Sequence, residues 1–398
     1  RYNRCRYKDT YTMHSTFQRD RFTWLSYLVF GIYVYFLNIL GPITPFLKDE
    51  LHLTYTISSF HFSAFAVGML VVGIGGNLVI KHFGRTRSLW LGLFGASLSA
   101  VVLLVGRNPI ITIAASFVMG TIGSLVLAII PAALADYHGE TKAVALTEAN
   151  VGASLFATAA GLFVGWSAQF LGNWRWALGI MALAPIFFYL FFRRDLDPIA
   201  DSSPTEELVQ TQKPLPILFW LLWLALVMSV SVEFCMIFWG ANYLEQTLGM
   251  PKANAAQAIS LFTAAMIAGR IIGSRIVQRF SPRAMISISA IIAGIGFLLF
   301  WTTSNIPLAL TGFFLVGFGI ANLYPFIISL AINAADGDSV QAGARTTLAS
   351  GTAILALPLA LGRLADAIGI HSAYAIVLLL LISVFLINQF TGKHKTAN

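Results

Sequence analysis

Long apolar runs follow one another along almost the whole chain, and they constrain its fold more than any other feature. A helix rises about 1.5 Å per residue, so about 20 apolar residues span the roughly 30 Å hydrocarbon core of a bilayer. Breaks rich in Gly, Pro, Asn or charge separate twelve such runs, at 23–47, 57–80, 88–106, 109–135, 144–170, 174–192, 216–244, 255–279, 284–303, 307–333, 344–368 and 372–391. The pattern predicts an all-α integral membrane protein with twelve transmembrane helices.

The composition agrees with a lipid environment. Only 11% of the residues are charged, whereas soluble proteins carry about 25%. A chain with so few charges cannot cover a water-exposed surface of this size. The two cysteines, Cys5 and Cys235, lie far apart in the sequence and imply neither a disulfide framework nor a metal site.

One connection is much longer than the others. The segment RRDLDPIADSSPTEELVQTQKP is polar and contains three prolines, which is typical of a linker. It predicts an N-terminal six-helix bundle at 22–193, a linker at 194–214 and a C-terminal six-helix bundle at 215–392, with tails at 1–21 and 393–398. Residues 1–12 differ in character from the rest, so we expect Met13 to be the natural start.

Positive charges predict the orientation of the spans. With both termini inside, cytoplasmic segments hold 19 of the 25 Lys and Arg residues, external loops hold four, and two lie within spans. Cytoplasmic loops of membrane proteins carry an excess of Lys and Arg. We therefore expect both termini in the cytoplasm, a location in the plasma (inner) membrane, and no nucleic-acid partner despite the net charge of +8.

The two predicted bundles resemble each other. GNLVIKHFGRTRSLWLG from Gly76 aligns with GSRIVQRFSPRAMISIS from Gly273 at an offset of 197 residues. The same offset relates two more pairs of glycines, Gly120 with Gly317 and Gly172 with Gly369. Related halves in a membrane protein indicate a binding site near the bilayer midplane, where the halves meet.

The pattern of twelve spans, long central loop and basic loops after spans 2 and 8 resembles the major facilitator superfamily over nearly the whole chain. The loop NLVIKHFGRTR matches the superfamily signature at Gly84, Arg85 and Arg87. Lys81 stands where that signature has an acid that helps to lock the halves together. The resemblance implies a transporter, but it leaves this lock in doubt.

Details of the spans favour some branches of the superfamily over others. VEFCMIFWGANYLEQTLG and AGRIIGSRI are most similar to the fucose/hexose–proton symporter branch, although spans 1 and 4 lack the mid-span carboxylates of that branch. Ser116 occupies the place where many proton-coupled members have an arginine in span 4. Span 5 has glycines but no Gly-Pro motif, which lowers the expectation of drug efflux.

Polar residues at helical spacing mark faces of several spans that could line a solute path. In the superfamily, spans 1, 4, 7 and 10 line the central cavity. Helix packing is the alternative explanation, above all for the Gly and Ser members of these stripes. Our candidate solute-binding residues are Tyr35, Asn38, Asn150, Trp239, Tyr243 and Asn322.

Charged residues within spans are the strongest functional signal. A charge at the bilayer centre costs at least about 2.5–3.5 kcal/mol. Glu233 could be protonated at rest, paired with a cation, or bound to solute, and we favour a proton-coupling role. Depth along the helices separates Glu233 from Arg270, so we expect Arg270 to pair with Glu148 in a cytoplasmic gate.

These observations predict a secondary transporter that moves a small organic solute by alternating access and works as a monomer. We favour proton-coupled symport of a sugar-like or other polar neutral solute. A proton-coupled exporter of drugs or amphipathic compounds is the alternative, and a non-transporting membrane sensor is a remote one. No catalytic constellation, metal site or cofactor motif is evident, so we expect neither an enzyme nor a cofactor.

Overall fold

The computed structural model describes residues 17–199, 214–276, 279–335 and 339–393, and these residues form helices and no strands. Residues 1–12, Met13 and most of the predicted linker lie outside the described residues. The helices are α1 (Arg21–Glu50), α2 (Tyr55–Phe83), α3 (Arg85–Val105), α4 (Pro109–His138), α5 (Lys142–Phe170), α6 (Arg175–Phe192), α7 (Ile217–Leu248), α8 (Lys252–Ile276), α9 (Pro282–Thr302), α10 (Ile306–Ile320), α11 (Leu323–Asn333), α12 (Ser339–Ile368), α13 (Ile370–Ala373) and α14 (Ala375–Lys393), with short 3-10 turns at Gly139–Thr141 and Arg193–Ile199.

The lengths of these helices suit a membrane. Eleven stretches within the described residues are long and apolar enough to cross it, and one of them, Pro109–Phe170, is 62 residues long. That stretch contains both α4 and α5, which a short 3-10 turn separates. Counting α4 and α5 as two crossings gives room for all twelve predicted spans.

Equivalent positions in the two halves have equivalent structures, which explains the 197-residue offset. Asn108 caps α4 by accepting from the backbone N–H of Ile110, and Asn305 caps α10 by accepting from that of Leu308. Such caps satisfy backbone donors that have no partner within the helix.

The repeated glycines also allow the same close helix contact in each half. A Cβ on Gly120 would lie 2.2 Å from the carbonyl oxygen of Phe65, and one on Gly317 would lie 2.4 Å from that of Phe262. Phe65 and Phe262 are themselves 197 residues apart. Each glycine therefore lets a neighbouring helix approach at the same place in its bundle.

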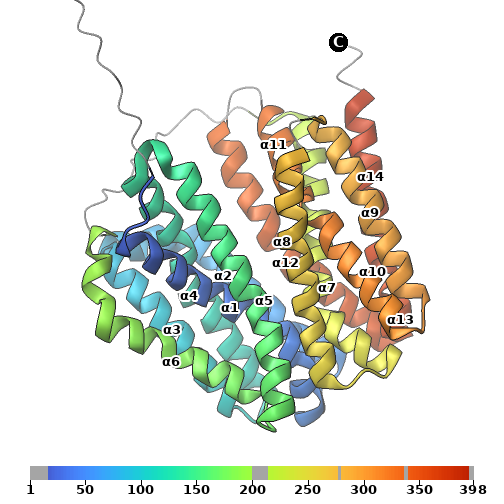
Figure 1. Ribbon diagram of the computed structural model, residues 1–398, viewed down its shortest axis with the longest axis horizontal. Coiled ribbons are helices and arrows are strands. Elements are labelled where there is room, and N and C mark those ends of the chain that lie inside the picture. The colour runs from blue at the N-terminus through green and yellow to red at the C-terminus, as the bar shows by residue number, and fades with distance from the viewer. Residues whose placement is uncertain (1–16, 200–213, 277–278, 336–338, 394–398) are drawn as a thin grey trace, which may run out of the picture.

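The two halves lie side by side in Figure 1, with α1–α6 on the left and α7–α14 on the right. We call the end of the molecule where α1 begins and α14 ends the terminal face and the other end the opposite face; in Figure 1, α1 begins at the left and α14 ends at the upper right. The charge distribution predicts that the terminal face is cytoplasmic.

The tenth predicted span is interrupted. A turn at Ala321 and Asn322 separates α10 from α11, where the sequence predicted one helix over 307–333. Pro325 lacks the N–H that would bond to the carbonyl of Ala321, and its ring crowds that carbonyl, so it breaks the helix here. Discontinuous helices in transporters often border the transport site.

Candidate functional site

The two halves make close contact on the side of the molecule that leads to the opposite face. A Cβ on Gly41 of α1 would lie 2.1 Å from the carbonyl oxygen of Ile237, so α1 and α7 touch backbone to backbone here. Next to this contact, the rings of Phe62 and Phe238 stack with their centroids 4.1 Å apart, and Trp239 packs edge-on against Phe62. This apolar contact closes the space between the halves toward the opposite face.

Polar contacts strengthen this closure at its outer rim. The Asp366 carboxylate of α12 accepts from the backbone N–H groups of Tyr55 and Thr56, both at 2.8 Å, and so caps α2 of the other half. Lys252 at the start of α8 pairs with Asp49 at the end of α1. Both contacts join the N-terminal half to the C-terminal half.

Helices α5 and α8 pack against each other across the halves and bring a polar stripe to the middle of the molecule. The Ser260 hydroxyl donates to the carbonyl of Thr158 at 2.6 Å. Nearer the terminal face, the Arg270 guanidinium of α8 donates to the Ser154 hydroxyl of α5 at 3.0 Å. These contacts arise because the Asn150–Ser154–Thr158–Gly161 stripe of α5 faces α8.

Glu233 lies close to this junction. It follows the start of α7 by sixteen residues, about 24 Å along the helix. Within the described residues, its half-buried carboxylate has no hydrogen bond and no ion pair within 4 Å, but Arg270 lies near enough to act on it electrostatically. Among the described residues no ion pair within 4 Å joins Glu233 to Arg270, and the separate roles expected for the two side chains stay a prediction.

The break in span 10 holds Arg270 in place. The Asn322 amide donates to the carbonyl of Gly269 at 2.8 Å, one residue before Arg270. A Cβ on Gly273 would collide with the Asn322 side chain at 2.3 Å. One face of α8 thus packs on the broken helix through two glycines, and the Arg270 side chain extends from another face toward α5.

Three aromatic residues predicted to line the solute path have other partners. The fully buried Tyr35 donates to the carbonyl of Ala177 in α6, inside the N-terminal half. Tyr243 bonds to Trp301 and His371, inside the C-terminal half. Trp239 belongs to the closure and donates to the carbonyl of Pro358. Helical spacing identified shared faces correctly, but it could not tell which neighbour each face meets.

The three predicted amides differ from one another in position. Asn38 lies one turn before Gly41 on α1, level with Glu233, which lies one turn before Ile237 on the parallel α7. Asn150 is exposed nearer the terminal face and donates to the carbonyl of Leu146 in its own helix. Asn322 fixes α8, as described above, and so acts on Arg270 through the backbone.

The predicted Glu148–Arg270 pair is not formed in this conformation. Glu148 instead receives two hydrogen bonds from Arg19, at 2.6 and 2.9 Å, in the segment that precedes α1. Ser154, the partner of Arg270, is six residues further along α5, about 9 Å deeper. The sequence could not show that Arg19 returns to α5, since the two segments are 129 residues apart.

The signature loop has an acidic partner from elsewhere in the chain. Gly84 ends α2 with φ of +79°, a conformation that favours glycine, and α3 begins at Arg85. The Arg85 guanidinium pairs with Asp136 near the end of α4 at 2.6 Å. This pair lies within the N-terminal half and braces it.

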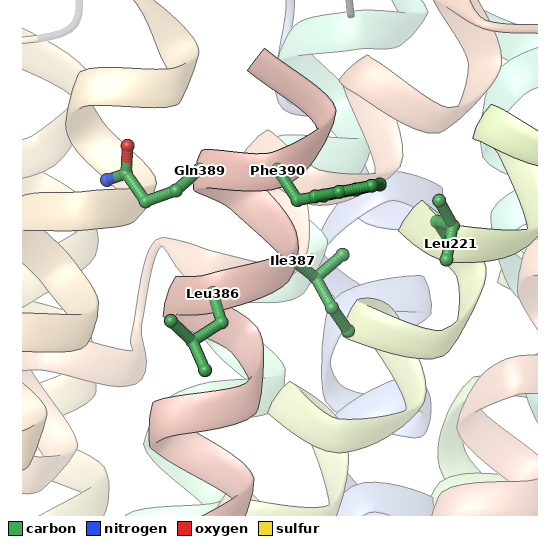
Figure 2. Close-up of a pocket in the computed structure, with 5 residues that line it drawn as sticks. All are labelled: Leu221, Leu386, Ile387, Gln389 and Phe390. Carbon is green, nitrogen blue, oxygen red and sulfur yellow. The ribbon is translucent and has the colours of Figure 1, made fainter. Parts of the chain in front are cut away.

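A surface hollow of about 410 Å³ lies away from this junction. Leu221 of α7 and four residues of α14, Leu386, Ile387, Gln389 and Phe390, line it (Figure 2). The hollow is predominantly apolar and opens on the outer side of the C-terminal half. Within the described ranges, no three His, Cys, Asp or Glu side chains gather closely enough to hold a metal ion.

Solved structures share this architecture. A bacterial homolog of the human lysosomal transporter Spinster, in an inward-facing and unoccupied conformation, superposes with a TM-score of 0.73 at 13% identity, over 94% of this chain and 98% of its own. A mutant form of the peptide transporter POT, in complex with sulfate, gives 0.75 at 14% identity, over 93% and 95% of the two chains. At these identities the likeness concerns the fold.

Sequence relatives agree with the structural ones. An uncharacterized MFS-type transporter of Yersinia pestis is 25% identical over 86% of this chain and 89% of its own. A TsgA homolog of Yersinia pestis is 22% identical over 78% and 80% of the two chains. The family model of the Major Facilitator Superfamily matches residues 24–344. Its members are transporters and not enzymes, and this chain belongs to the Major Facilitator Superfamily.

Proposed function

We propose that this protein is a secondary active transporter that moves a small organic solute by alternating access and couples this movement to protons through Glu233. The superfamily supports transport across a membrane. Proton coupling rests on one observation, the Glu233 carboxylate at mid-depth, which forms no ion pair within 4 Å among the described residues. Ionisable groups at such depth are costly and are usually functional.

The position of Glu233 supports this role. It lies near the junction of α1, α5, α7 and α8, level with Asn38 and on the terminal side of the closure at Gly41. A carboxyl group favours its protonated form when it is buried and its ionised form when water reaches it. When the halves rock about the junction, Glu233 would meet water from one side and then from the other, and so bind and release a proton.

Charge and scaffold support the remaining parts of the proposal. The excess of Lys and Arg in the predicted inner segments favours cytoplasmic termini. Nothing in the sequence requires a second subunit, so we propose a monomer in the plasma (inner) membrane. The sugar-like solute was expected from uncharged amides and from Tyr35, Trp239 and Tyr243, and the polar groups of these three aromatic residues bond to backbone carbonyls within the described structure.

Glu233→Gln tests proton coupling. The variant keeps the shape and hydrogen-bonding capacity of the side chain but cannot ionise. In proteoliposomes with a solute identified by screening, we expect it to lose accumulation driven by a pH gradient while retaining exchange of solute across the membrane. Glu245→Gln is the matched control, since Glu245 lies on the same helix near the opposite face, 3.7 Å from Lys252. Normal pH-driven accumulation by Glu233→Gln would refute the proposal.

A further inference from the structure

Arg270 has a cationic side chain at mid-depth, and among the described residues it forms no ion pair within 4 Å. A guanidinium offers five N–H donors in a planar fork that matches carboxylate and phosphate groups. Its recorded bond, to the Ser154 hydroxyl, uses one nitrogen atom and a neutral acceptor. Arg270 is exposed where α8 meets α5, so donors remain available to a ligand.

The helices that pack against α8 offer Arg270 few acidic partners. Helices α1, α5, α7 and α10 pack against α8. Their acidic residues are Glu148 on α5, which is held by Arg19, Glu233 on α7, and residues near the opposite face, Asp49, Glu50 and Glu245. Helix α10 contains no charged residue. In the described part of the chain, none of these acids forms an ion pair with Arg270 within 4 Å.

Ser154 and the broken helix preorganise the guanidinium. The Ser154 hydroxyl donates its proton to the carbonyl of Asn150 at 2.8 Å, so its oxygen can only accept from Arg270. On the other side, Asn322 fixes the backbone of α8 at Gly269. Because Arg270 is held from both sides, its side chain loses little further conformational entropy when it binds an anion.

We propose that the Arg270–Ser154 pair forms the site for an anionic group of the solute, which makes the transported compound a small organic anion with a carboxylate or a phosphate. This inference rests on the proposed transport function and names its substrate class. Glu233 borders the same junction, whereas Asn38 is buried and its amide donates to the carbonyl of Val34 in its own helix. Glu233 would balance the Arg270 charge at a distance when the site is empty.

Matched ligand pairs test the substrate class. The purified full chain is heated with gluconate or glucose, lactate or lactamide, succinate or succinamide, and glycerol phosphate or glycerol, and the shift in its unfolding temperature is measured. We expect stabilisation by the charged member of at least one pair and none by its neutral counterpart. The proposal is overturned if only neutral compounds stabilise the protein, or if no compound in the panel does.

Variants assign the effect to the site. Arg270→Gln should weaken binding of the stabilising anion roughly 10- to 100-fold, because it removes a charged hydrogen-bond donor. Arg270→Lys should retain part of the binding, and Ser154→Ala should weaken it less than Arg270→Gln does, with recovery in Ser154→Thr. Arg363→Gln, which removes the other arginine within a span, should change nothing. Equal binding by Arg270→Gln and the unaltered protein overturns the assignment.

The two proposals fail in different ways. A ligand that binds through Arg270 but does not enter proteoliposomes under a pH gradient, a sodium gradient or solute exchange would contradict transport and leave the anion site intact. A neutral solute that enters under a pH gradient, with equal rates in the Arg270→Gln variant, would support transport and contradict the anion site.

Discussion

The two ends of the interface between the halves use charge differently. Toward the opposite face, polar contacts join the two halves: Asp366 accepts from the first turn of α2, and Lys252 pairs with Asp49. Toward the terminal face, the recorded ion pairs among the described residues stay within the N-terminal half, as Arg85–Asp136 and Arg19–Glu148 do. Among the described residues, these contacts between the halves lie toward the opposite face, and these two ion pairs toward the terminal face hold parts of the N-terminal half together.

The difference places the candidate site. Glu233 and Arg270, both in the C-terminal half, lie on the terminal side of the apolar closure and form no ion pair with each other within 4 Å. In alternating access the opposite-face contacts must break and contacts at the terminal face must form. The four variants below test this contrast, from the largest expected effect to the smallest.

Gly41→Leu should have the largest effect. No side chain fits where a Cβ would lie 2.1 Å from the Ile237 carbonyl, so the opposite face cannot close and transport should fall at least about 10-fold. Uptake and the distance between spin labels across the opposite face measure this. Gly294→Leu is the control, since a Cβ on Gly294 meets open space. Normal uptake by Gly41→Leu would show that this contact is not needed for closure.

Asp366→Ala should have the next largest effect. It removes the carboxylate that accepts from two N–H groups in the first turn of α2 and leaves no clash, and such capping contacts contribute about 0.5–2 kcal/mol. We expect the closed population of the opposite face to fall roughly 2- to 30-fold relative to the open one. Spin-label distances report this ratio. Asp136→Asn, which breaks a pair within one half, should leave the ratio unchanged, and an equal shift in both variants would contradict the contrast.

Asp49→Asn should act more weakly. Its ion pair with Lys252 is partly exposed, and such pairs contribute about 0–1 kcal/mol and are screened by salt. The closed population should change by less than about 5-fold, and the change should vanish at high ionic strength. Glu50→Gln, which affects a pair with Arg175 inside the N-terminal half, is the control. A larger shift that persists in salt would show that the pair does more than stabilise the rim.

Arg19→Gln should have the smallest effect. The Arg19 side chain is 48% exposed, so the loss of its pair with Glu148 should change the uptake rate less than about 3-fold. The same variant also tests the predicted gate between Glu148 and Arg270. A larger change that disappears in the Arg19→Gln, Glu148→Gln double variant would indicate that freed Glu148 takes another partner, with Arg270 as the predicted one.

The sequence by itself determined the architecture. Apolar runs, loop charges and a 197-residue offset are local properties of the chain, and each has one physical explanation in a bilayer. They led to an all-helical membrane protein with related halves, and the described helices and the family match confirm that class. The sequence also singled out Gly84, through its match to the signature loop, and Glu233 and Arg270, because a charge within a span is costly.

Only the tertiary structure decided what each polar residue meets. Tyr35 and Tyr243 carry the right spacing for a solute path, yet their hydroxyls bond inside their own halves. Arg19 returns to Glu148, and Ser154 receives Arg270, through contacts between segments more than 100 residues apart. A helical period fixes which residues share a face, but the neighbour of that face depends on how all the helices pack. The candidate site is therefore a property of the packed halves, and the spans that form it are a property of the sequence.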